Sequence, residues 1–326
     1  MNKFKVGDSV MAFSWTYDAP SGVYKNHDLS AQIRFAAIAE TKFMQFVKPE
    51  PGYGRKQGES VTITRVSQLA VPTSGQITEG VRIPEDNLSI STIAITVTEW
   101  GRSVPYTSLS EDLSMFNVEN IVQRVLKDQM KIVMDGAAAA GFTSSNTQIC
   151  ATPLTAGSIQ FGTTGVAPAV ANANLNVYHV EEIRDYMYNT LRVPAFEGDD
   201  YIAIVSTRAK RGIVSDPNWE TWHKYTDPAA KYNGEIGRIE NIRFIETNNA
   251  KALSNLVGTS TSLGEAVFFG ADAVAMAVVQ DPELRAMIPG DYGRQKGVAW
   301  YGIAQWGIIW NTANAGEARI VHVTSL

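Results

Sequence analysis

Two stretches rich in β-branched residues, 60–66 and 88–98, most limit what this chain can fold into. The second alternates polar and apolar residues along most of its length, so we predict two strands that form the arms of one long β-hairpin. Pro72, Gly75 and Pro84 indicate a polar, irregular tip between them. A two-stranded ribbon of this kind is marginally stable alone in water, so we expect it to lie on another surface, and a neighbouring copy is a candidate.

A long amphipathic helix is predicted to follow the hairpin. Ser110 is a suitable N-cap, Glu111 and Asp112 place acidic groups in the first turn, and the helical pattern continues to Ala140. Such a helix of about 25 to 30 residues is longer than most in globular proteins and would act as a rigid spine. Small residues at 136–141 permit close backbone approach. Its apolar face is formed by Val118, Ile121, Val122, Val125, Leu126, Ile132 and Val133.

The remaining segments alternate between helical and strand patterns, which indicates a mixed α/β unit. Helices are predicted at 29–47 and 180–191, strands at 201–205, 241–247 and 265–269, and a small hairpin around 162–165. Residues 298–310 are apolar on both faces, as in a central strand. With 318–323 they are expected to close a sheet against the long helix.

Composition excludes several classes of protein. The 326 residues are 44% apolar and carry a net charge of −5, so bulk charge does not attract the chain to nucleic acid or to an anionic membrane. Cys150 is the single cysteine, so no intrachain disulfide can form, and the four histidines show no metal-ligand spacing. Without a signal-like start or eighteen uninterrupted apolar residues, neither secretion nor membrane insertion is expected.

Acid–base chemistry has three candidates, and each has a simpler interpretation. Adjacent carboxylates point apart, so Asp199-Asp200 and Glu181-Glu182 cannot readily share a proton and are expected to be solvated. His179 could act as a base, but a histidine at a helix start is more often a surface or capping group.

Binding motifs are equally weak. Gly52, Gly54 and Gly58 imitate a phosphate loop with the wrong spacing, so a turn is favoured. Trp300, Trp306 and Trp310 could stack on bases, but without interleaved Arg or Lys, core packing is favoured. A basic patch at 208–211 could meet phosphate or an acidic partner, although a solvated loop is the simpler interpretation. We therefore predict no catalytic, cofactor-binding or metal-binding residues.

The order of these parts resembles the major capsid proteins of tailed bacteriophages with the Hong Kong 97 fold. Segments 78–84, 93–107 and 237–247 carry the likeness, which extends over about residues 30–325. The resemblance implies an α+β fold with an N-terminal arm, an extended β-hairpin loop, a long spine helix, a peripheral domain and an axial domain. The implied boundaries are 1–50 for the arm with a short helix, 51–100 for the loop, 101–177 for the peripheral domain with the spine, 178–270 for the axial domain and 271–326 for returning strands.

The resemblance also implies a structural subunit rather than an enzyme. Pentamers and hexamers of the chain would form an icosahedral head that encloses double-stranded DNA. The chain would contact this DNA non-specifically. The head would assemble in the host cytoplasm and form part of the virion. Expected partners are further copies, a portal and a separate scaffolding protein, with a decoration protein as a further candidate. No membrane is expected. No covalent crosslink is predicted, because Lys56 is the only lysine near the loop and precedes its first strand. The residues expected at contacts between subunits are Arg65, Glu79, Arg82, Glu85, Asp86 and Arg102.

Two alternatives stay open. An encapsulin-like nanocompartment shell would have the same fold but would enclose cargo enzymes in place of a genome. A cytoplasmic α/β enzyme using His179 or Asp199-Asp200 belongs to a different class and would be a small oligomer.

Overall fold

The computed structural model describes residues 35–153, 159–168, 171–217, 219, 235–253 and 264–326. Residues 1–37 and 38–326 form two units, and all the helices and strands described lie in the second. The helical segments are η2 (Phe43–Phe46), α1 (Ser108–Leu113), α2 (Val118–Thr143), α3 (Val177–Asp185), η3 (Tyr186–Thr190), α4 (Thr207–Val214) and η4 (Asp291–Gly293). The strands are β1 (Lys48–Pro49), β2 (Ser60–Val66), β3 (Ile90–Thr96), β4 (Thr98–Thr107), β5 (Gln148–Ala151), β6 (Ile159–Gly162), β7 (Tyr201–Ser206), β8 (Glu235–Ile239), β9 (Ile242–Thr247), β10 (Gly264–Phe269), β11 (Val274–Ala286), β12 (Gln295–Ile308) and β13 (Ile320–Ser325).

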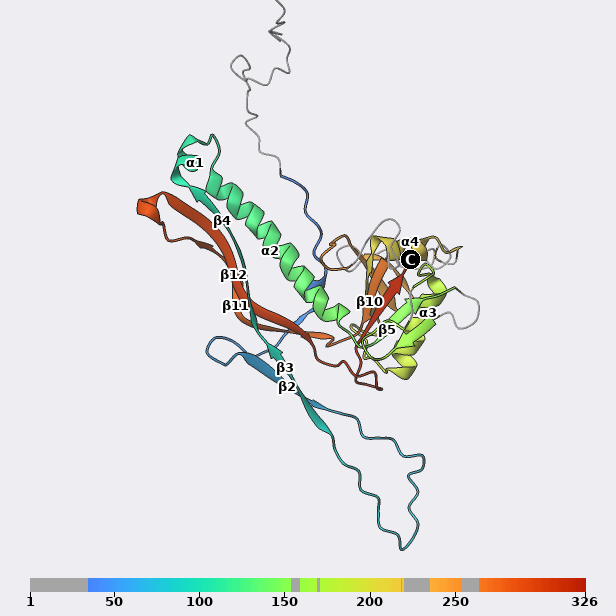
Figure 1. Cartoon of the computed structure of the whole chain (residues 1–326). Helices are drawn as coiled ribbons and strands as arrows, with labels where there is room; N and C mark the ends of the chain where they lie inside the picture. Colours follow the sequence, from blue (N-terminus) through green and yellow to red (C-terminus); the bar gives the residue numbers. More distant parts are fainter. Residues whose placement is uncertain (1–34, 154–158, 169–170, 218, 220–234, 254–263) are drawn as a thin grey trace, which may run out of the picture. The chain divides into compact units, whose positions relative to one another are not determined.

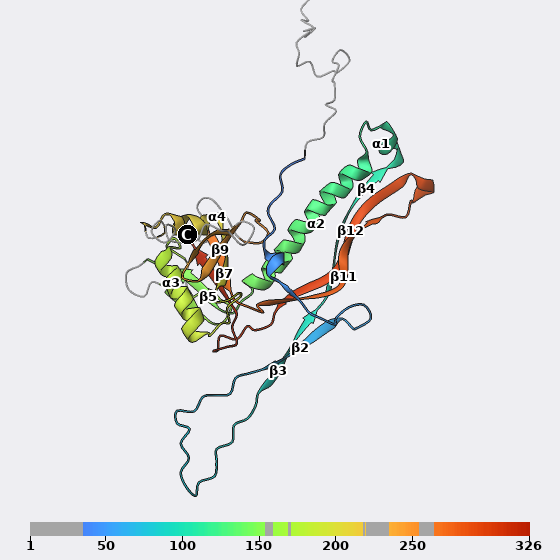
Figure 2. The same ribbon diagram turned by 180° about the vertical axis from the view of Figure 1, so that it is seen from behind.

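One sheet of four strands is covered on one face by α2, as Figures 1 and 2 show from opposite sides. Its strand order is β1-β11-β12-β4. Alternate residues of β12 are fully buried, among them Trp300, whose indole Nε1 donates to Gln129 Oε1 of α2 at 3.3 Å. The central position predicted for 298–310 is therefore confirmed.

A second sheet of seven strands has the order β6-β5-β13-β10-β7-β9-β8. β7 is buried at every position, and the strands predicted at 201–205, 241–247 and 265–269 are all present. One prediction was wrong: 318–323 does not join 298–310 in a sheet against the long helix. β13 lies in the seven-stranded sheet instead, because it pairs with β10 and β5.

The small hairpin predicted around 162–165 is displaced. β5 and β6 do form an antiparallel pair, but the connection between them is 152–158, part of which lies outside the described residues. Gly165, with φ of +79°, follows the second strand instead of joining the two. The turn-forming residues were recognised, but their place relative to the strands was wrong. The five-part domain division stays a prediction.

The spine predicted at 110–140 is divided into two helices. Thr107 caps α1 and Asn117 caps α2, the latter through Oδ1, which accepts from Asn120 N at 2.9 Å. Two strong caps so close in sequence favour a break over one continuous helix. The small residues act as predicted, since a Cβ added to Gly141 would lie 3.3 Å from Val274. Val125, predicted on the apolar face, is instead half exposed.

The helix predicted at 29–47 is wrong over its described part. Residues 35–42 have no regular structure and only η2 is helical, while 29–34 lie outside the described residues. The buried carboxylate of Asp135 on α2 accepts from the backbone N–H of Phe43 at 2.8 Å and of Met44 at 3.3 Å. Asn249 Nδ2 donates to its other oxygen at 3.1 Å. This carboxylate fixes one helical turn and points Phe43 into the core.

Replacing Asp135 tests this anchor. Burial raises the pKa of Asp135 above its usual value, and hydrogen bonds from the Asn249 side chain and from the backbone N–H groups of Phe43, Met44 and Lys42 oppose that rise. Asp135→Ala would leave buried donors without an acceptor, so we expect it to lower the free energy of unfolding by about 3 kcal/mol. Urea denaturation measures the change, and Asp128→Ala on the same helix is the control. Equal stability of the two variants would refute the anchor.

Candidate assembly surface

The hairpin formed by β2 and β3 lies with one face on its own chain. Val61, Ile63 and Ile95 pack with Ala275 and Ala277 of β11 in a small apolar cluster. The predicted hairpin is thereby confirmed, with Ser60 opposite Thr96 and Val66 opposite Ile90. The opposite face is exposed and consists of Thr62, Thr64, Val66, Ile90, Thr92, Ala94 and Thr96.

The loop beyond the two strands, residues 67–89, buries almost none of its side chains. Positions 68–89 are all exposed, and the loop extends past β2 and β3 (Figure 1). Contiguous exposed apolar surface marks an interaction site. The large aliphatic side chains concerned, 46 to 77% exposed, are Leu69, Val71, Ile77, Val81, Ile83 and Leu88.

The charged residues predicted at contacts lie mostly on this hairpin loop. Glu79, Arg82, Glu85 and Asp86 are all exposed, and Arg82 forms an ion pair with Glu85. Exposed pairs of this kind contribute little to the stability of the subunit. These four residues share one exposed loop, in which only Arg82 and Glu85 are seen to pair, and their contact with another subunit stays a prediction.

The two other predicted contact residues are placed differently. Arg102 is exposed on β4, which forms one edge of the four-stranded sheet. Arg65 faces its own chain: its Nη1 donates to the carbonyl of Ile309 at 2.9 Å, and its guanidinium lies over the ring of Trp310. Sequence reasoning recognised the charge of Arg65 but missed this partner.

A second exposed apolar group lies where α1 meets the turn between β11 and β12. Ser108 N donates to the carbonyl of Arg294 at 3.0 Å, which joins the two segments. Tyr292 is fully exposed in a left-handed turn with φ of 52°, a conformation unfavourable for a tyrosine. We call this group the distal tip; it consists of Leu109, Leu113, Met115, Ile288 and Tyr292. It was missed because exposed and buried apolar residues look alike in sequence, although Pro289-Gly290 signals the turn.

The acid–base candidates are engaged in structural contacts. His179 is buried, its Nδ1 accepts from Asn176 N at 3.2 Å, and its Nε2 lies 2.9 Å from the carbonyl of Thr152. Asp200 is buried between Arg238 at 2.6 Å and Arg243 at 2.7 Å, whereas Asp199 is exposed. The capping interpretation of His179 is confirmed, and the solvated interpretation of Asp200 is wrong.

Glu181 and Glu182 are half-buried rather than fully solvated. Burial raises the pKa of Glu181, and the carboxylates of Glu240 and Asp216 raise it further.

A hollow of about 890 Å³ lies beside His179. Two of its polar lining groups already have partners, since Asn176 Oδ1 accepts from His179 N and Asp216 Oδ2 accepts from Val177 N.

The residues of the predicted binding motifs have packing, turn or ion-pair roles within the chain. Trp300 and Trp306 are buried, as expected for core packing, and Gly52 and Gly58 have positive φ, as expected for turns. The patch at 208–211 lies in α4 rather than in a loop, where Lys210 pairs with Glu246 at 2.6 Å. Among the described residues, no cluster of His, Cys, Asp and Glu could hold a metal ion. No described helix is long and apolar enough to cross a membrane.

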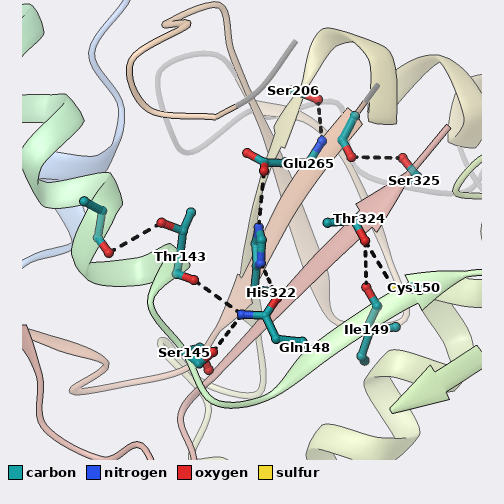
Figure 3. A network of polar contacts seen from close by, with 12 residues as sticks. Thr143, Ser145, Gln148, Ile149, Cys150, Ser206, Glu265, His322, Thr324 and Ser325 are labelled. Atoms are coloured by element: carbon teal, nitrogen blue, oxygen red, sulfur yellow. Dashed lines mark hydrogen bonds and ion pairs between the residues drawn. The ribbon is translucent and has the colours of Figure 1, made fainter. Parts of the chain in front are cut away.

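A buried polar network joins strands of the seven-stranded sheet (Figure 3). His322 of β13 lies between Gln148 of β5 and Glu265 of β10, with Nδ1 2.6 Å from Gln148 Oε1 and Nε2 3.9 Å from Glu265 Oε1. Gln148 Nε2 in turn donates to the carbonyl of Ser145 at 2.7 Å. Burial lowers the pKa of His322, and the Glu265 carboxylate opposes this shift. Gln148 and His322 are buried, and the contacts of the network link β5, β13 and β10 within the sheet.

His322 should make stability depend on pH. Its folded-state pKa lies below the ordinary 6.5, so the unfolded chain takes up the proton first as the pH falls. The neutral histidine therefore contributes stability that is fully present above about pH 6.5, the ordinary pKa of the unfolded chain. This stability is lost as the pH falls from there toward the lower pKa of the folded state. As the pH falls from about 7.5 to 5, we expect the wild type to lose more of its free energy of unfolding than His322→Gln does, measured by urea denaturation at each pH. Parallel pH profiles would contradict this.

Comparison with known proteins finds similarity only at the level of structure. No protein-family model and no curated protein matches the sequence. The head structure of Helicobacter pylori bacteriophage KHP40 aligns with a TM-score of 0.71 at 13% identity, covering 97% of this chain and 99% of that chain. The Cyanophage Pam1 capsid asymmetric unit gives 0.69 at 12%, covering 95% and 98%. The capsid of Ralstonia phage GP4 gives 0.63 at 16%, covering 96% and 98%. The α+β class and the capsid fold predicted from the sequence are thereby confirmed.

Proposed function

We propose that this chain is the major capsid protein of a tailed phage, which assembles as pentamers and hexamers into an icosahedral head around double-stranded DNA. The observation that carries the proposal is a capsid fold over nearly the whole chain, combined with a hairpin loop whose positions 68–89 are all exposed and include six large aliphatic side chains. The chain acts as a structural subunit rather than as an enzyme. It assembles in the host cytoplasm and resides in the virion.

The hairpin loop supplies one contact between subunits. Its exposed aliphatic side chains gain free energy when a neighbouring copy removes them from water, by about 25 cal/mol for each Å² of apolar surface. Glu79, Arg82, Glu85 and Asp86 give such a contact its polar part, and Arg102 offers a charge for a separate contact at the edge strand β4. Each interface is modest, but a closed shell repeats it many times, so weak contacts add up.

The remaining partners follow from the same function. A separate scaffolding protein guides assembly, a portal occupies one vertex, and a decoration protein is a further candidate. Packaged DNA is met by local, non-specific phosphate contacts only, because a net charge of −5 gives the chain no overall attraction to nucleic acid.

A nanocompartment shell is the nearest alternative function, because it would use the same fold. The contents of purified particles separate the two, since a phage head holds DNA and a nanocompartment holds a cargo enzyme. The enzyme alternative is disfavoured, because His179 and Asp200 already serve as structural partners.

Deleting residues 71–84 tests the role of the hairpin loop. The β2–β3 ladder and its cluster with β11 lie outside the deletion, so the subunit should stay folded and soluble but fail to close shells. Negative-stain electron microscopy with the scaffolding protein measures assembly, and circular dichroism checks the fold. Full-size particles from the deleted chain would refute the proposed contact.

The distal tip is proposed as a second contact between copies, because its apolar side chains are also unburied. Ile288→Ser combined with Tyr292→Ser should leave the free energy of unfolding within about 0.5 kcal/mol of wild type, since exposed positions contribute little. Shell yield, measured by gradient sedimentation, should fall several-fold. Thr64→Ala, an exposed change elsewhere, is the control. Wild-type yield from the double variant would exclude this surface.

A further inference from the structure

At one point the hairpin is attached to its own subunit by two arginines that lie against the ring of Trp310. The guanidinium carbons of Arg65 and Arg319 lie 5.6 and 5.7 Å from the ring centroid of Trp310. Arg65 also donates to the carbonyl of Ile309 at 2.9 Å, and Arg319 donates to the carbonyl of Ala271 at 3.0 Å. Each guanidinium is thus held by a backbone oxygen and by the same indole, so β2 is tied to the segments before β11 and after β12.

A notch holds the hairpin at a second point. Ile95 of β3 is 4% exposed and lies over Gly307 of β12. A Cβ added to Gly307 would lie 2.9 Å from Ile95 Cγ1, which is shorter than the van der Waals contact distance between two carbon atoms. Only glycine leaves room for this isoleucine while the strands keep their positions.

The two attachments are separated along the ladder, which determines what they can do. Arg65 is opposite Ser91, and Ile95 is opposite Val61, so the two points are four residues apart, about 13 Å at about 3.3 Å per residue. One point would let the hairpin swing about it. Two points separated along its length fix its direction relative to the four-stranded sheet.

We propose that these residues, Arg65, Trp310, Arg319, Ile95 and Gly307, form a mount that sets the direction of the hairpin and thereby the angle between neighbouring subunits. This inference rests on the proposed function, because it assigns the hairpin loop a neighbour to contact. Arg65 is then a positioning residue: it stays within its own subunit and acts through the loop it aims. A change in the mount alters shell curvature without altering the contact surface itself.

Hydrogen exchange of the free subunit tests the mount without requiring assembly. Arg65→Ala removes the stacked cation, and Arg65→Lys keeps the charge but loses the planar group that lies over Trp310. Both variants should raise exchange of the amides of 60–66 and 90–96 by about tenfold, while the core strand β7 keeps its protection. Thr64→Ala, on the exposed face of the same strand, is the control. Exchange equal to that of the control in both variants would overturn the mount.

Electron microscopy of assembled particles then tests its consequence. We expect the wild type to form shells of one diameter. Arg65→Ala and Gly307→Ala should each form shells of mixed diameter and open sheets, and the number of closed shells of wild-type size should fall by about tenfold. Wild-type diameters and yield from both variants would overturn the link between mount and curvature. If wild type itself forms no shells, the proposed function fails, whereas the exchange result still decides the mount.

Discussion

The packing of the C-terminal half of α2 supports both sheets at once. The ring centroid of Phe142 lies 5.5 Å from that of Phe43 in η2 and 4.7 Å from that of Phe269 in β10. This one side chain of α2 therefore connects η2 and the seven-stranded sheet. The same buried cluster includes Trp300 and Trp306 of the four-stranded sheet. Loss of this packing would separate the two sheets, and the hairpin mount would lose the strands that hold it.

Local periodicity predicted the elements that carry their own pattern. The hairpin arms alternate with period two, and β7, β9 and β10 are short apolar runs between turns, so each was found near its true bounds. The exceptions depend on distant residues. The segment 35–47 has helical spacing, but Asp135, about ninety residues away, accepts its backbone N–H groups and limits it to one turn. β13 has an ordinary strand pattern, and nothing in that pattern says which sheet it joins.

The candidate site was predictable in part for the same reason. Exposed charges on the loop are evident from a polar stretch between two strands. The hydrogen-bond partner of Arg65, the carbonyl of Ile309, is 244 positions further along and could not be found from spacing. The distal tip is invisible in sequence because its apolar residues resemble those of a core. His179 and Asp200 show the reverse effect: residues suited to catalysis are buried, and their hydrogen bonds go to the backbone and to arginines.

Since residues 68–89 are exposed throughout, the identity of their side chains hardly enters the folding free energy of the subunit. The mount, in contrast, admits few alternatives, because Gly307 has no space for even a methyl group. The two parts are therefore under different physical constraints. The loop is free to change together with whatever surface it meets, while the base of the hairpin is constrained to preserve a direction, and assembly specificity can diverge without a new fold.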